Sequence, residues 1–146
     1  MAKKIQKILI DANAFISLNW LHDSNHQKTK EIFQRLKKKK CQLWTNNYLV
    51  AEVLTVLLQK LKDVRAVSQT GYQFYSPSKY LKTYQITLKI QQKSLSIFSQ
   101  QEKPKLSFPD CTLVAQAIDQ KITTIFTFDR NIKKFPLFKK NFKFIS

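Results

Sequence analysis

The sequence predicts an α/β fold in which helices cover both faces of a parallel sheet. Short apolar and β-branched runs alternate along the chain with segments whose apolar residues recur at helical spacing, an alternation typical of parallel sheets. Two of the nine acidic residues, Asp11 and Asp129, directly follow strand-like runs. Residues just beyond the carboxyl ends of parallel strands face the ligand crevice, so these scarce acids also indicate where a functional site lies.

The first elements are a strand over residues 5–10 and a short helix over 12–18. The next helix has Ile32, Phe33 and Leu36 on one face. Ser24 and Gln27 have the spacing of a capping box at its start. Lysines 37–40 at its end suit the negative end of the helix dipole.

A second strand is expected over residues 41–45, and Asn46 or Asn47 can cap the helix that follows. That helix carries a wide apolar stripe as far as residue 61. Asp63 can cap a further helix to about residue 75, where Pro77 ends it, although Gly71 weakens this prediction.

Residues 81–86 are expected to form a third strand. A helix follows, whose face is predicted to consist of Leu88, Gln91, Gln92, Leu95 and Phe98. Residues 99–105 are predicted to be a surface loop.

The clearest late helix starts at Ser107, which can cap it, with Pro109 in its first turn and Asp110 three residues after the cap. Its expected buried face is Leu113, Val114, Ala117 and Ile118. Strands are predicted over 122–128 and 142–145.

The length and composition predict a single domain over residues 1–146 with a packed core. No apolar stretch reaches the roughly 18 residues of a membrane span, so no membrane association is expected. The first residues are too polar for a signal peptide, which makes a cytoplasmic location the expectation. Cys41 and Cys111 fit no metal-ligand spacing and are expected to be semi-buried thiols, and His22 and His26 to be exposed.

The net charge of +17 favours a polyanionic partner such as nucleic acid. The 23 lysines against 3 arginines also fit the coding bias of an A/T-rich genome, and charge does not separate RNA from DNA or an acidic protein. The candidate phosphate contacts are two clusters, Lys37, Lys38, Lys39 and Lys40, and Lys133, Lys134, Lys139 and Lys140.

Glu52 and Asp110 complete a set of four acids with Asp11 and Asp129. Each acid alone could be a helix cap or a solvated residue. Together they fall near strand ends or helix starts that would face one crevice, and carboxylates gathered there repel one another unless a cation neutralises them. Mg²⁺ prefers such oxygen ligands, so the set predicts metal-dependent phosphodiester chemistry.

This arrangement resembles the PIN-domain nucleases. Residues 8–15 (ILIDANAF) are similar to the family's opening motif, and residues 48–54 (YLVAEVL) contain its second acid. Residues 106–115 (LSFPDCTLVA) and 126–129 (FTFD) match its third and fourth motifs, in the family's order.

The resemblance implies a three-layer α/β/α domain and Mg²⁺- or Mn²⁺-dependent cleavage of RNA. It places Asp11, Glu52, Asp110 and Asp129 around the metal, with Asn13 and Thr127 orienting Asp11 or a water. It also implies a VapC-type toxin, often a homodimer, which an antitoxin protein holds inactive.

Three alternatives remain open at this point. The chain could be a housekeeping RNA-processing or structure-specific nuclease of the same fold. It could be a catalytically inactive RNA-binding module, which the intact acid set argues against. It could also be a receiver-type or phosphate-transferring α/β protein, which the absence of a glycine-rich phosphate loop disfavours.

Overall fold

A computed structural model describes residues 4–136, 138 and 141–146. Within these residues five parallel strands pair in the order β3-β2-β1-β4-β5. The strands are β1 (Lys7–Ile10), β2 (Gln42–Asn46), β3 (Leu81–Tyr84), β4 (Thr124–Phe126) and β5 (Lys143–Ile145). The helices are α1 (Ala12–Asn19), α2 (His26–Lys38), α3 (Asn47–Leu61), α4 (Val64–Tyr75), α5 (Leu88–Ser99), α6 (Phe108–Gln120) and α7 (Arg130–Lys133). The predicted parallel α/β fold is confirmed.

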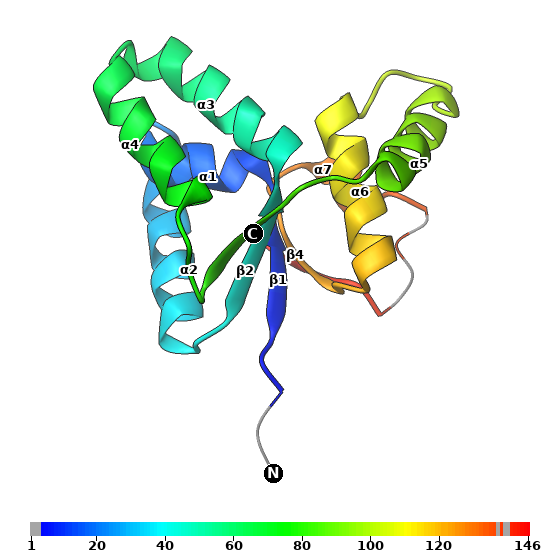
Figure 1. The fold of residues 1–146 in the computed structure, drawn as a ribbon, viewed down its shortest axis with the longest axis horizontal. Coiled ribbons are helices and arrows are strands. Elements are labelled where there is room, and N and C mark those ends of the chain that lie inside the picture. The colour runs from blue at the N-terminus through cyan, green and yellow to red at the C-terminus, as the bar shows by residue number, and fades with distance from the viewer. Residues whose placement is uncertain (1–3, 137, 139–140) are drawn as a thin grey trace.

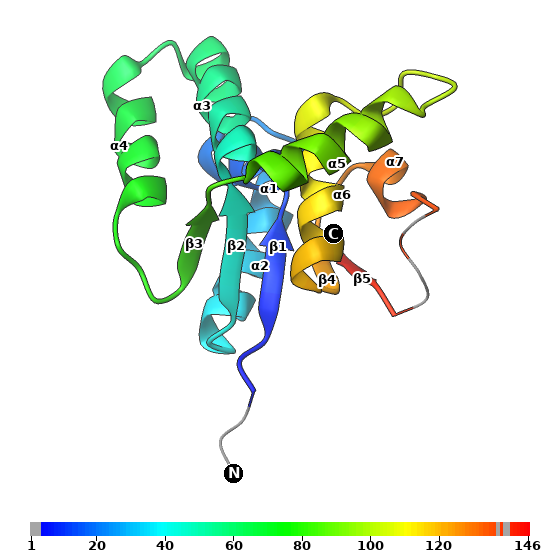
Figure 2. The same ribbon diagram turned by 45° about the vertical axis from the view of Figure 1, so that its right-hand side comes forward.

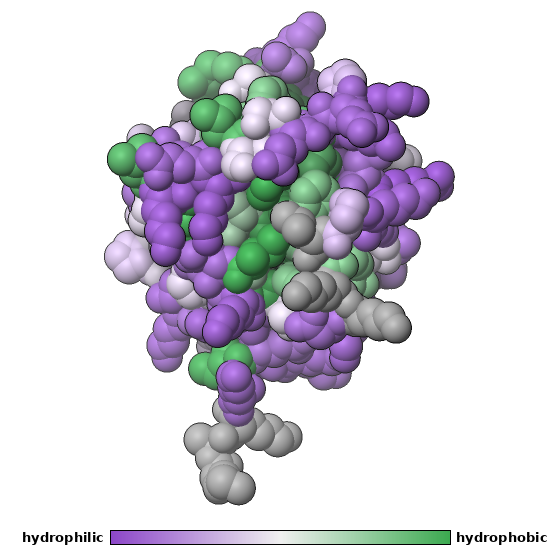
Figure 3. Space-filling view, turned by 90° about the vertical axis from the view of Figure 1, so that its right-hand side faces the viewer, coloured by the Kyte–Doolittle hydropathy of each residue, from purple (hydrophilic) through white to green (hydrophobic). Residues whose placement is uncertain are grey.

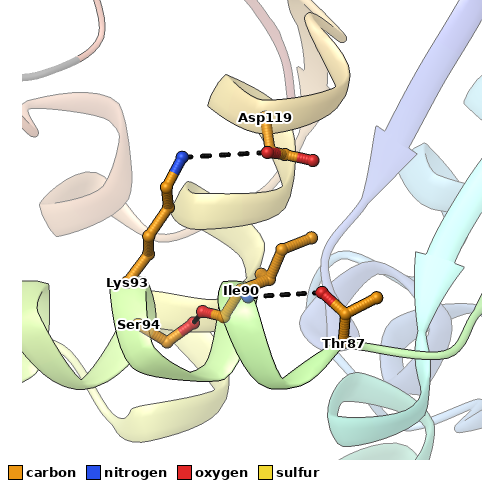
Figure 4. A network of polar contacts seen from close by, with 5 residues as sticks. All are labelled: Thr87, Ile90, Lys93, Ser94 and Asp119. Carbon is orange, nitrogen blue, oxygen red and sulfur yellow. Dashed lines mark hydrogen bonds and ion pairs between the residues drawn. The ribbon is translucent and has the colours of Figure 1, made fainter.

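The helices form a layer on each side of the sheet. Helices α1 to α4 lie on one side and α5 and α6 on the other (Figure 1), and Figure 2 shows the strands rising side by side between them. Helix α5 packs against α6, where Lys93 lies 3.7 Å from Asp119 (Figure 4). Both side chains of this ion pair are partly exposed, so it adds little to stability.

Strand β1 is the buried centre of the sheet. Its residues Ile8, Leu9 and Ile10 are fully buried, and it pairs with β2 on one edge and β4 on the other. A strand covered on both faces reads as a continuous apolar run rather than an alternating one. The strand begins at Lys7, later than expected, because Ile5 is 62% exposed and lies outside the core.

Helix α3 begins where β2 ends because Asn46 changes the direction of the chain there. The backbone of Asn46 is extended and its Oδ1 accepts a hydrogen bond from the Leu49 amide at 2.9 Å. Its Nδ2 donates to Gln116 Oε1 at 2.9 Å and to Thr112 Oγ1 at 3.3 Å. One buried amide therefore caps α3 and joins it to α6. Of the two caps considered possible, Asn46 is the one used.

Helix α4 passes through Gly71 without interruption, and its packing explains why. A Cβ at Gly71 would lie 3.3 Å from Cδ1 of Leu54 on α3, so the missing side chain lets the two helices approach closely. Asp63 caps α4 as expected, accepting from the Ala66 amide at 3.1 Å.

Some local predictions were wrong. The capping box at Ser24 does not form, because α2 begins after Asn25, which makes no side-chain cap bond. On α5 the expected apolar face points outward, since Leu88 is 69% exposed and the helix buries Ile90 and Ser94 instead. Ile118 of α6 is likewise exposed.

Three lysines adopt left-handed backbone conformations just past helix ends. Lys40, Lys62 and Lys121 have φ of 53–54° and follow α2, α3 and α6. Glycine normally fills such positions because it has no Cβ to clash, but the chain contains one glycine. The positive charges face the negative ends of the helix dipoles, which offsets part of the strain.

Within the described part of the chain, no helix combines the length and the apolar character that crossing a membrane requires.

Replacing Asn46 by Ala should lower the free energy of unfolding by about 2–4 kcal/mol, because it removes a cap and the buried amide that donates to Gln116 Oε1 on α6. Urea denaturation measures the change. Asp63→Ala, which removes an exposed cap of α4, should cost only about 0.5–1 kcal/mol. Equal losses in the two variants would contradict a role for Asn46 beyond capping.

Candidate metal centre

Asp11 occupies the first position after β1 and is 2% exposed. Its amide donates to the carbonyl of Phe126 at the end of β4, at 2.9 Å, so the backbone is held to the sheet. Its Oδ1 accepts from the Ala12 amide at 2.7 Å and caps α1. The capping role considered for this residue is therefore real, but it occupies one oxygen only.

The second oxygen of Asp11 is held by two side chains from neighbouring segments. Thr127 Oγ1 donates to Oδ2 at 2.7 Å, and Asn13 Nδ2 donates to the same atom at 3.2 Å. Asn13 Oδ1 accepts from the Phe128 amide at 3.2 Å, and Thr127 Oγ1 accepts from the Asp129 amide at 3.0 Å. Asn13 and Thr127 thus fix the carboxylate of Asp11 and the turn that leads to Asp129.

Asp110 and Glu52 come from helix starts that lie near the end of β1. Asp110 forms a capping box with Ser107, in which Asp110 Oδ2 accepts from the Ser107 amide at 2.8 Å. Glu52 lies in the second turn of α3 and is half-buried. Carboxylate oxygens of Asp11, Glu52 and Asp110 all lie within 4.8 Å of one another, which is close enough for one cation to contact all three.

Asp129 is the fourth acid and takes a more peripheral place. It lines the same cavity of about 320 Å³, which we call the acid pocket, but is not part of the close group of three. It caps α7, its Oδ1 accepting from the Asn131 amide at 2.8 Å. The other residues lining the acid pocket are Asn13, Ile16, Lys105 and Ser107.

Burial, and to a smaller extent the neighbouring charges, raise the pKa values of Asp11, Glu52 and Asp110. Burial raises the pKa of Asp11 to about 7, with the charge of Asp110 adding to the effect and the bond from Thr127 opposing it. Burial, then the charges of Asp110 and Asp129, raise the pKa of Glu52. Burial also raises the pKa of Asp110, against the hydrogen bonds from Ser107. A divalent cation among these oxygens would favour the ionised forms, so the donor set fits a hard metal ion.

The structure separates the two lysine clusters expected to contact phosphate. Lys37 to Lys40 run from the last turn of α2 into the short connection before β2, so they lie at the amino ends of the strands, opposite the acids. Lys133 and Lys134 adjoin α7 near Asp129, and Lys133 Nζ donates to Ser146 Oγ at 2.6 Å. Lys139 and Lys140 lie outside the described residues.

Lys105 is the charged residue of the acid pocket that the sequence analysis did not single out. It lies in the loop before α6, which was expected to be only a surface loop, and lines the acid pocket. As one lysine among 23, it is distinguished in the sequence only by standing five residues before Asp110.

The cysteines and histidines lie outside the pocket lining. Cys41 and Cys111 are free and buried, and burial raises the pKa of the Cys111 thiol to about 11, which keeps it protonated and unreactive. His26 is only partly exposed, and its Nδ1 lies 2.8 Å from the Ser17 carbonyl oxygen.

The chain is an α/β protein with a carboxylate cluster at the carboxyl ends of its parallel strands, an arrangement consistent with a metal site. Residues 8–137 match the sequence profile of the PIN domain, and the chain belongs to this family. No curated protein matched the chain in sequence.

Solved structures share the fold. VapC20 of Mycobacterium tuberculosis, a sarcin-ricin loop cleaving toxin, superposes with a TM-score of 0.75 at 20% identity, over 86% of this chain and 92% of the other. A toxin–antitoxin complex from Klebsiella pneumoniae gives 0.60 at 18% identity, over 93% and 98%. VapBC2 of Rickettsia felis, bound to a promoter DNA fragment, gives 0.66 at 13% identity, over 96% and 98%. The predicted similarity to VapC toxins is confirmed at the level of fold.

The raised pKa of Asp11 predicts that the protein without metal loses stability as the pH rises. The folded state holds a proton on Asp11 up to a pH of about 7, whereas the unfolded chain releases it near 4. Its contribution is therefore fully present below pH 4 and is lost between pH 4 and 7, by roughly 4 kcal/mol over the window.

Asn at position 11 does not titrate, so in chelator the margin between the unfolding free energy of Asp11→Asn and that of the parent should shift in favour of the variant from pH 4 to pH 7. Denaturant titrations of both proteins across this range measure the margin. A margin independent of pH would contradict the raised pKa.

Proposed function

We propose that the chain is a metal-dependent endoribonuclease that hydrolyses RNA phosphodiester bonds, and that it acts as the toxin of a toxin–antitoxin pair. The observation that carries the proposal is the group of three carboxylates within 4.8 Å, with a fourth lining the same pocket. Membership of the PIN domain family supports the same function.

Asp11, Glu52 and Asp110 would hold Mg²⁺ or Mn²⁺, and Asp129 would hold a second ion or a water at the rim. When bound, such an ion lowers the pKa of its water and withdraws charge from the scissile phosphate. Thr127 and Asn13 keep one Asp11 oxygen directed by hydrogen bonds of 2.7 and 3.2 Å, and Ser107 does the same for Asp110. This preorganisation means that little rearrangement is needed before catalysis.

RNA is the proposed substrate because the surface is strongly basic, with a net charge of +17. VapC20, which shares the fold, is a toxin that cleaves the sarcin-ricin loop. An antitoxin partner is proposed because structures of the same fold include toxin–antitoxin complexes. A homodimer and a cytoplasmic location belong to the same proposal.

Replacing Asp11 by Asn should reduce RNA cleavage by a factor of about 10²–10³ while leaving the protein folded. Asn keeps the capping oxygen for Ala12 but removes one negative charge from the proposed metal site. Cleavage of a mixed RNA substrate with Mg²⁺ or Mn²⁺ measures activity, and thermal melting with chelator measures folding.

Asp63→Asn is the matched control, because it makes the same change at an N-cap of α4 outside the acid pocket. It should cleave like the parent. If Asp11→Asn also cleaves like the parent, the catalytic assignment of Asp11 is wrong. If it loses activity only because it unfolds, Asp11 is a structural cap.

RNA binding through lysines should weaken steeply with salt, because neutralised phosphates release their counterions. Neutralising Lys133, Lys134, Lys139 and Lys140 together should reduce both the affinity and the slope of log affinity against log salt. The same change at Lys37 to Lys40 tests the cluster at the opposite end of the strands. Fluorescence anisotropy with labelled RNA measures both quantities. An affinity that does not change with salt concentration would contradict phosphate contacts by the lysines.

A further inference from the structure

A second cavity, of about 700 Å³, adjoins the acid pocket, and Lys105 lines both. One wall is the loop between α5 and α6, and the other is α7 with the residues that follow it. Figure 2 shows this loop projecting beyond α5 on the side where α7 lies. We call this cavity the lysine pocket. Its volume lies in the roughly 300–1,000 Å³ range of small-ligand sites.

The loop that carries Lys105 is held in place by the side chain of Gln101. Gln101 Oε1 accepts from the amides of Leu106 and Lys105, at 2.8 and 3.2 Å, and its Nε2 donates to the Leu106 carbonyl at 3.1 Å. The Gln101 side chain thus hydrogen-bonds to backbone amides and a carbonyl of the loop, as a neighbouring β-strand would. Lys105 therefore projects from a backbone fixed between the two cavities.

The lysine pocket has the opposite charge to the acid pocket. Lys103, Lys105 and Lys134 line it, against one acid, Glu102. Three cations next to four carboxylates give a steep change in potential over a short distance. A nucleic-acid strand with one phosphate at the four carboxylates would place its neighbouring phosphate near these lysines.

The lysine pocket also has an apolar wall with an aromatic ring. Leu106 is buried, and Phe135 is half-buried, with its ring edge-on to Phe138 at 6.0 Å between centroids. On this face of the molecule a strip of hydrophobic residues lies between hydrophilic side chains (Figure 3). Aromatic rings beside cations are how proteins hold single-stranded nucleic acid, since the ring stacks on a base while the cations contact phosphate.

We propose that the lysine pocket binds the nucleotide next to the scissile phosphodiester of a single-stranded RNA, with Lys105 on the phosphate between the two pockets and Phe135 against the base. This inference rests on the proposed nuclease function. The bound segment is single-stranded because a base paired in a duplex cannot turn into a side pocket.

Adenosine 5′-monophosphate is the probe for this site. The isotope-labelled full chain is titrated in chelator, and backbone NMR shifts report where the probe binds. Shifts should concentrate at Leu106, Asn131, Lys134 and Phe135. Inorganic phosphate and adenosine, each alone, should bind at least about tenfold more weakly, because each lacks one half of the contacts.

Two variants separate the halves of the site. Lys105→Ala should weaken the mononucleotide by about tenfold, and Lys105→Arg should restore most of the affinity. Phe135→Leu, which keeps an apolar side chain in the core, should weaken the mononucleotide about fivefold or more and leave inorganic phosphate unchanged. Lys30→Ala, an exposed lysine on α2 away from the pocket, is the control and should bind like the parent.

The inference is overturned if the shifts map elsewhere, if phosphate binds as well as the nucleotide, or if a triglutamate peptide competes equally well, which would indicate an acidic protein segment. Chelator keeps this result separate from catalysis. Nucleotide binding without RNA cleavage would remove the nuclease proposal and the place of the nucleotide beside a scissile bond, and would keep only a nucleotide site. Cleavage without nucleotide binding would remove the site alone.

Discussion

The positions of Asp11, Glu52 and Asp129 in the pocket depend on the pairing of β1 between β2 and β4. The hydrogen bond from the Asp11 amide to the Phe126 carbonyl continues this pairing one residue past the strand. It sets Asp11 beside Thr127, which in turn fixes the turn that carries Asp129. The same sheet edge starts α3, which brings Glu52. A slip of one residue between β1 and β4 would turn Asp11 away from Thr127. The register of these strands therefore determines the geometry of the site.

The carboxylates gathered in the acid pocket suit the proposed function but lower the stability of the fold. Four carboxylates share about 320 Å³, and burial makes the ionised form of Asp11 unfavourable. The hydrogen bonds from Thr127, Asn13 and Ala12 satisfy its oxygens without neutralising its charge. The apolar core around β1 offsets this cost through the hydrophobic area that it buries.

Most patterns that act within a few residues were predicted well from the sequence, and so was the gathering of the acids, whereas the packing of helix faces and loops against distant segments was not. The cap at Ser107 and the apolar run of β1 depend on neighbouring residues, and both form. The exposed face of α5 was misjudged because Leu88 and Leu95 have helical spacing, which cannot say which of two apolar faces meets α6. Lys105 was not predicted to lie at the site, because only the fold brings its loop to the acids. The lysines of α2 and α7 looked equivalent in sequence, and the direction of the strands separates them.

The left-handed lysines change how the charge of this chain should be read. The residues that take the left-handed conformation just past helix ends, where glycine is the usual residue, are Lys40, Lys62 and Lys121. Lysines thus fill structural positions in this chain, and three of the positive charges behind its net charge of +17 stand just past helix ends. All surface cations contribute to the long-range attraction of a polyanion. Discrimination between polyanions depends on the few cations that lie together at the binding site. For the proposed RNA substrate, the total charge would set the rate of encounter, and the local arrangement of lysines would decide which RNA segment is bound.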